Sequence, residues 1–140
     1  MKNLIITSIF SLISLVSFSQ KLNFMSFGFY SVNITTNPKI KLQKLTNVKP
    51  TKDFTHWDGF NHYEVDLNKK VVIHCYVGEA YGEKLKIYNL ITTKDYYSFD
   101  VKSKSATERS FLIPRNQKSK YNLLIKYKEG DSTHVALFGS

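Results

Sequence analysis

The sequence is poor in the residues that build helices, disulfide frameworks and phosphate-binding loops. Its 140 residues include three alanines, one cysteine, three prolines and six glycines. Alanine is the strongest helix former, so its scarcity argues against a helical bundle. A single cysteine excludes an internal disulfide framework and a cysteine-rich zinc site. The glycines are scattered, and the chain contains no Gly-rich phosphate loop and no complete hydrolase motif.

Aromatic residues, by contrast, are abundant. They make up 14% of the chain, with nine tyrosines and ten phenylalanines, and hydrophobic residues in total reach 42%. This fraction is enough for a packed core, and the aromatic and β-branched residues suit the pleated surface of a sheet. The length allows one domain. The composition therefore predicts a single all-β domain.

The first nineteen residues are typical of a cleaved signal peptide. Lys2 supplies a positive start, residues 4–18 are uncharged and mostly apolar, and Ser17 and Ser19 stand at the positions that a signal peptidase reads. The apolar run is shorter than the roughly 20 residues that span a bilayer, which disfavours the alternative of an uncleaved anchor. We expect residues 1–19 to be removed and residues 20–140 to be secreted or periplasmic, with no membrane span in the mature chain.

The positive charge of the chain is carried almost entirely by lysine. The formal net charge is +9, and of the 20 basic residues only Arg109 and Arg115 are arginines. Arginine reads phosphates and base edges with a planar fork, whereas lysine is a hydrated point charge. Lys84 and Lys86 flank Leu85, a spacing typical of the solvated face of a strand. The pattern argues against sequence-specific nucleic-acid binding, and a surface patch for polyanions is the alternative.

Alternating apolar and polar residues recur at the spacing of an all-β domain. The expected strands cover residues 22–34, 40–45, 60–67, 71–77, 85–91, 96–101, 109–113, 121–127 and 133–138. Residues 46–59 form a longer connection, and the other joints are short and polar. Short joints predict an antiparallel meander of eight or nine strands, which forms either a β-sandwich or a small, partly open barrel.

The apolar positions of these strands predict the core. We expect nine residues to be buried: Val65, Val71, Ile73, Phe99, Val101, Leu123, Ile125, Val135 and Leu137.

The hairpin formed by residues 60–67 and 71–77 has two conceivable registers. A two-residue turn at Asn68 and Lys69 would pair His62 with Cys75, and would mix polar with apolar side chains on each face. A three-residue loop would instead pair Glu64 with His74, and would collect most of the strong hydrophobes on one face. Burial therefore favours the three-residue loop.

In that register His62, Glu64 and His74 lie together on the outward face of the hairpin. Two imidazoles and a carboxylate can form a metal site, or an acid and a base for hydrolysis. These three residues are the candidate catalytic and metal-binding residues. The alternative is that they only solvate the sheet, and we predict no cofactor.

Two further residues invite a functional interpretation. Trp57 lies in a connecting segment, where its ring would be either a stacking platform for a sugar or a cap on one end of the core. It is the candidate ligand-binding residue. Cys75 is expected to be a small buried hydrophobe, and the alternatives are an intermolecular disulfide or a nucleophile.

Two classes of function follow from these observations. The first is an exported, non-enzymatic β-domain that binds a protein partner, a polysaccharide or a small apolar ligand. The second is a small secreted hydrolase or nuclease that uses His62, Glu64 and His74. The export signal, the aromatic content and the absence of a complete catalytic motif favour the first.

Overall fold

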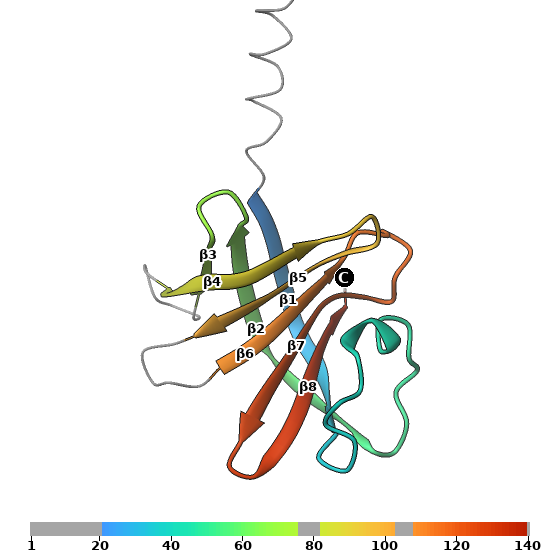
Figure 1. The fold of residues 1–140 in the computed structure, drawn as a ribbon. Coiled ribbons are helices and arrows are strands. Elements are labelled where there is room, and N and C mark those ends of the chain that lie inside the picture. Colours follow the sequence, from blue (N-terminus) through green and yellow to red (C-terminus); the bar gives the residue numbers. More distant parts are fainter. Residues whose placement is uncertain (1–20, 76–81, 103–107, 140) are drawn as a thin grey trace, which may run out of the picture.

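The computed structural model describes residues 21–75, 82–102 and 108–139, in which eight antiparallel strands form a closed barrel (Figure 1). The strands follow the barrel wall in sequence order, and β8 closes it by pairing with β1. Their bounds are β1 (Lys21–Asn33), β2 (Phe54–Asp66), β3 (Val71–Cys75), β4 (Glu83–Thr92), β5 (Tyr96–Lys102), β6 (Glu108–Pro114), β7 (Tyr121–Glu129) and β8 (Ser132–Gly139). The predicted antiparallel meander is confirmed. The architecture is a closed barrel, neither a sandwich nor the partly open barrel that was the other expectation. The predicted signal segment lies outside the described residues.

The interior of the barrel is a packed core that follows the period of two along each strand. On β6, for example, Phe111 and Ile113 face the interior, and each is less than 5% exposed. Five of the predicted core residues belong to this interior cluster: Val65, Phe99, Val101, Leu123 and Ile125. Because alternate residues of a strand face the same side, one side of every strand contributes to the interior.

A second core lies on the outer side of the barrel, under the segment that connects β1 to β2. Leu42 and Leu45 of this segment pack against the outer faces of β6, β7 and β8, where Val135 and Leu137 are fully buried. The connecting segment, drawn in cyan and teal, lies beside β8 in Figure 1. Val135 and Leu137 are therefore buried as predicted, but outside the barrel.

The strand predicted over residues 40–45 does not form. A single turn of 3-10 helix, η1 (Leu42–Lys44), takes its place, and β2 begins at Phe54, inside the predicted connection. In a 3-10 turn residues three apart lie on one face, so Leu42 and Leu45 both reach the second core. The described residues contain no helix that is long and apolar enough to cross a membrane.

The hairpin of β2 and β3 adopts the other register. Tyr63 pairs with His74 and Val65 pairs with Val72, so the predicted three-residue loop is wrong. The Lys69 N–H donates to Asp66 Oδ1 at 2.9 Å, which stabilises the observed turn. Lys70 closes the turn with a positive φ of 54°, a left-handed conformation that a residue other than glycine adopts at a cost in free energy. The prediction assumed that most hydrophobic residues of the hairpin share the inner face. It fails because the outer face of this barrel also carries apolar side chains.

The observed register turns each side chain of β3 to the face opposite to the predicted one. Val72 is fully buried in the interior, whereas Val71 and Ile73 lie on the outer face and are only half-buried. The prediction that Val71 and Ile73 belong to the core is therefore wrong. Cys75 shares their outward face and is half-buried, so the expectation of a buried cysteine is wrong as well.

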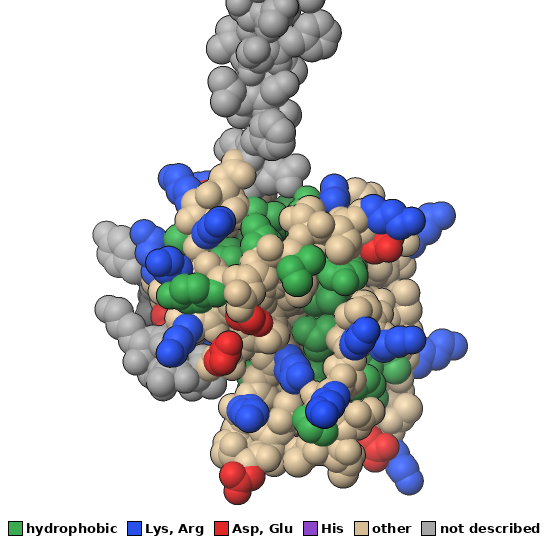
Figure 2. All heavy atoms as spheres, viewed as in Figure 1, with side chains coloured by type: hydrophobic (Ala, Val, Ile, Leu, Met, Phe, Trp, Pro, Cys, Tyr) green, Lys and Arg blue, Asp and Glu red, His purple; other side chains and the backbone are tan. Residues whose placement is uncertain are grey.

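The basic side chains on the face seen in Figure 2 do not gather into one patch. Figure 2 shows lysine and arginine side chains spread around the visible face, with other side chains between them. Lys84 and Lys86 flank the buried Leu85 on β4, as the alternation predicts.

Candidate functional site

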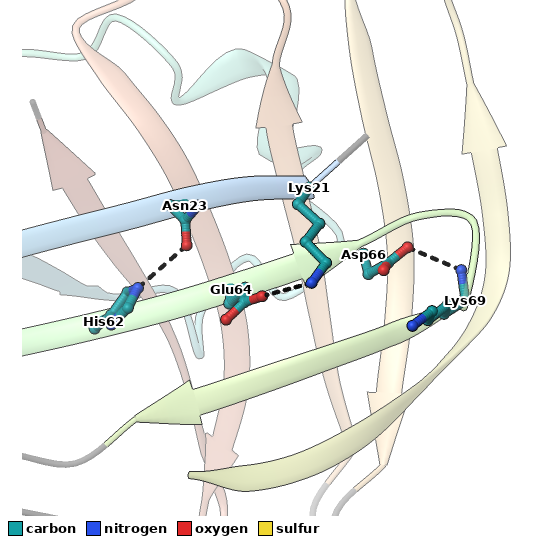
Figure 3. Close-up of polar contacts among 6 residues, drawn as sticks. All are labelled: Lys21, Asn23, His62, Glu64, Asp66 and Lys69. Carbon is teal, nitrogen blue, oxygen red and sulfur yellow. Dashed lines mark hydrogen bonds and ion pairs between the residues drawn. The ribbon is translucent and has the colours of Figure 1, made fainter. Parts of the chain in front are cut away.

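The residues of the predicted site do not come together. His62 and Glu64 lie on the outer face of β2, where each contacts a residue of β1 (Figure 3). His62 Nε2 lies 3.3 Å from Asn23 Oδ1, and Glu64 Oε1 lies 3.5 Å from Lys21 Nζ. His74 is directly opposite Tyr63 and therefore faces the interior of the barrel. Within the described ranges, no three His, Cys, Asp or Glu side chains are grouped so that they could hold a metal ion.

Trp57, the other candidate, lies within β2 rather than in a connection. Its side chain is 51% exposed, and Nε1 donates a 2.8 Å hydrogen bond to Ser31 Oγ on β1. This hydrogen bond holds the indole ring of β2 against β1. The ring does not line the cavity described next.

The interior of the barrel opens into a cavity of about 370 Å³ at the end that carries the β7–β8 turn. Eleven residues from six of the eight strands line it: Phe29, Asn61, Tyr63, His74, Arg109, Ile125, Tyr127, Lys128, Glu129, Ala136 and Phe138. Four of them, Tyr63, Ile125, Ala136 and Phe138, are buried and also belong to the interior core. The cavity is therefore a gap in the core that reaches the surface, with the exposed Lys128 and Glu129 at its rim.

Strand alternation explains how polar side chains reach this cavity. Arg109 lies two residues before Phe111 on β6, and His74 lies two residues after Val72 on β3, so both polar residues share the inward face. On β7, Tyr127 follows Ile125 in the same way. The alternation visible in residues 109–113 was the available signal for Arg109, because it places this arginine on the face of two strong hydrophobes.

A bend in β1 brings Phe29 into the wall of the cavity. The β1–β2 register shifts between Ser26 and Gly28, and a side chain at Gly28 would place its Cβ 2.9 Å from the carbonyl oxygen of Trp57. This close approach of two backbones requires glycine. Beyond the bend, Phe29 stacks on Phe138 of β8 with ring centroids 5.0 Å apart.

The wall of the cavity is largely aromatic. Tyr63 stacks on His74 with centroids 4.2 Å apart and planes 6° from parallel, and it meets Phe138 edge to face at 5.7 Å. Together with Phe29, these rings form a continuous surface across β1, β2, β3 and β8. Such contacts hold aromatic rings in place, so the wall is preformed.

Burial keeps His74 neutral. The pKa of His74 is lowered from the usual 6.5 to about 4, first by burial and then by the charge of Arg109, while Glu83 opposes the shift. The pKa of Tyr127 is raised, first by burial and then by Glu129. At neutral pH the charged residues that line the cavity are therefore Arg109, Lys128 and Glu129.

The arrangement suits the binding of a small molecule better than acid–base chemistry on the outer face. The cavity offers a rigid apolar wall, one inward arginine and a polar rim, which is the usual composition of a ligand site. The chain matches no protein-family model, no curated protein and no solved structure.

Proposed function

We propose that this chain is an exported, non-enzymatic binding protein that holds a small, largely apolar ligand in the cavity of its barrel. The observation that carries the proposal is the cavity of about 370 Å³ with a wall of stacked aromatic rings. Its volume is at the lower end of the range of about 300–1,000 Å³ that small-molecule sites occupy. A ligand of one or two rings, or a short alkyl chain, matches this size.

The composition of the wall supports an apolar ligand rather than a sugar or a polymer. Phe29, Ile125, Ala136 and Phe138 line the cavity with carbon atoms, and Tyr63 adds an aromatic ring that stacks on His74. Apolar surface that leaves water contributes about 25 cal/mol per Å². A ligand the size of an aromatic side chain buries roughly 150–250 Å², so apolar contact would contribute about 4–6 kcal/mol.

A direct test is native mass spectrometry of the mature protein isolated from its own host. We expect a retained small molecule, or an empty protein that takes up the neutral probe N-phenyl-1-naphthylamine in one-to-one stoichiometry with enhanced fluorescence. A protein that carries no molecule and does not bind the probe would contradict the proposal.

A substitution in the cavity wall tests whether the probe binds inside the cavity. Ala136 is buried and lines the cavity, so Ala136→Leu fills part of the free volume. We expect the affinity for the probe to fall about tenfold, because the added side chain occupies space that the ligand needs. The matched control is Thr92→Leu, which adds bulk at an exposed position outside the cavity and should leave the affinity unchanged. Equal affinities in the two variants would place the probe elsewhere.

A further inference from the structure

We propose that the ligand of this cavity is an amphipathic monoanion, an aromatic or short alkyl group that bears a carboxylate, and that Arg109 binds its charged end. The proposal rests on the proposed function and specifies the class of ligand. It follows from the position of one arginine, the charges around it and the apolar wall opposite.

Arg109 is held at the cavity by the barrel wall. It lies on β6 between Val101 of β5 and Tyr127 of β7, which are its cross-strand partners. Its side chain shares the inward face with Phe111 and lines the cavity half-buried. The strand therefore directs the Arg109 side chain into the cavity.

Arg109 forms no ion pair in the part of the chain that the structure describes. The ion pairs of Lys21 with Glu64 and of His56 with Asp58 do not include it. Glu129 borders the same cavity but forms no ion pair with Arg109. A partly buried charge without a counter-ion is unfavourable, so an anion that enters the cavity is attracted to Arg109.

The charges that line the cavity favour one negative charge on the ligand. Arg109 and Lys128 are positive and Glu129 is negative, which leaves one net positive charge. His74 adds no charge at neutral pH, because its pKa is about 4. A monoanion is neutralised by this set, whereas a phosphate dianion would leave one negative charge uncompensated. The guanidinium fork also matches the two oxygens of a carboxylate.

The rest of the ligand has an apolar surface to contact. Arg109 lies on β6, whereas the stacked rings of Phe29, Phe138 and Tyr63 lie on β1, β8 and β2. A molecule that fills the cavity therefore contacts a cation with one part and aromatic rings with another. An amphipathic anion would contact both parts of the lining. A fully apolar molecule would contact the aromatic rings and leave Arg109 without a partner.

The test uses two dyes that share one scaffold. The dye 8-anilinonaphthalene-1-sulfonate carries a negative charge, and N-phenyl-1-naphthylamine is the same molecule without the sulfonate. We expect the wild-type protein to bind both. In Arg109→Met, which keeps an unbranched apolar side chain but removes the guanidinium, the affinity for the anionic dye should fall about tenfold or more, since one charged hydrogen bond is lost. The affinity for the neutral dye should change less than about twofold.

The matched control is Arg115→Met, which removes the other arginine of the chain. Arg115 stacks on Tyr97 at 4.8 Å, donates to the Thr93 carbonyl oxygen and does not line the cavity. We expect it to bind both dyes like the wild type. A loss of anionic dye that is equal in the two variants would mean that only the net charge matters, and would overturn the proposal. Equal losses of both dyes in Arg109→Met, with an intact near-ultraviolet circular dichroism spectrum, would also overturn it.

A competition experiment tests the proposal without any variant. With the neutral dye bound to the wild-type protein, octanoate should displace it at a lower concentration than 1-octanol, although octanol is the more hydrophobic of the two. Equal or weaker displacement by octanoate would overturn the proposed anion site and leave the proposed apolar cavity standing. If the wild-type protein binds neither dye and neither competitor, the proposed function itself fails.

Discussion

Tyr63 and His74 face each other across the β2–β3 hairpin inside the barrel, with ring centroids 4.2 Å apart and nearly parallel planes. This pair places His74 in the cavity wall, away from His62 and Glu64 on the outer face. It also places an ionisable group where its charged form is disfavoured.

The protein should lose stability as the pH falls from about 6.5 to about 4. The pKa of His74 is about 4 in the folded protein, against 6.5 when unfolded, so the unfolded state binds more protons over this range. Protonation therefore favours unfolding, and below pH 4 the loss is complete. Because His74 is only partly buried, we expect a loss of about 1–2 kcal/mol.

Urea denaturation at pH 7 and pH 4.5 measures this effect. In His74→Gln the part of the pH dependence that comes from this residue should disappear. The control is His62→Gln on the outer face, which should retain the wild-type dependence. Identical pH dependence in the wild type and His74→Gln would contradict the buried position of His74.

Two adjacent valines test the register of the hairpin. Val72 is fully buried in the interior, and Val71 is half-buried on the outer face. We expect Val72→Ala to lower the free energy of unfolding by about 2–3 kcal/mol, and Val71→Ala by less than about 1 kcal/mol. Chemical denaturation measures the free energy of unfolding of both variants, and the same side-chain change is made at the two positions. The reverse order would indicate the three-residue loop, with Val71 inside.

The export prediction concerns the N-terminus. Residues 1–19 have the charge and apolar pattern of a signal peptide, so the native protein should begin at Gln20 and be found in the periplasm or the medium. N-terminal sequencing of the protein purified from its host checks this directly. A soluble cytoplasmic protein that retains Lys2 would refute the prediction.

Strand alternation was readable from the sequence because it is a local property. Side chains of a strand point to alternate faces, so Phe99 and Val101, or Leu123 and Ile125, could be assigned to the core before any pairing was known. The short polar joints likewise predicted antiparallel neighbours. The same alternation predicts that Arg109 faces inward, because it lies two residues before Phe111 on the same strand.

The register of β2 and β3 was not readable in this way. A one-residue slip exchanges the two faces of a strand, and the choice depended on a turn that contains no glycine. Counting hydrophobes favoured the wrong register, because Val71 and Ile73 were assumed to need the interior. They tolerate the outer face of the barrel, half-buried. The candidate site of His62, Glu64 and His74 depended on that register and is divided between two faces.

The sequence by itself determined the class of fold, the order of the strands and the faces of most of them, since composition and a period of two act within each strand. Only the tertiary structure decided that β8 pairs with β1, and this closure turns one face of the sheet into an interior. Closure brings Phe29 and Phe138 into contact, although they are far apart in the sequence. The cavity exists because six strands converge around it, and no segment of the chain contains that information locally.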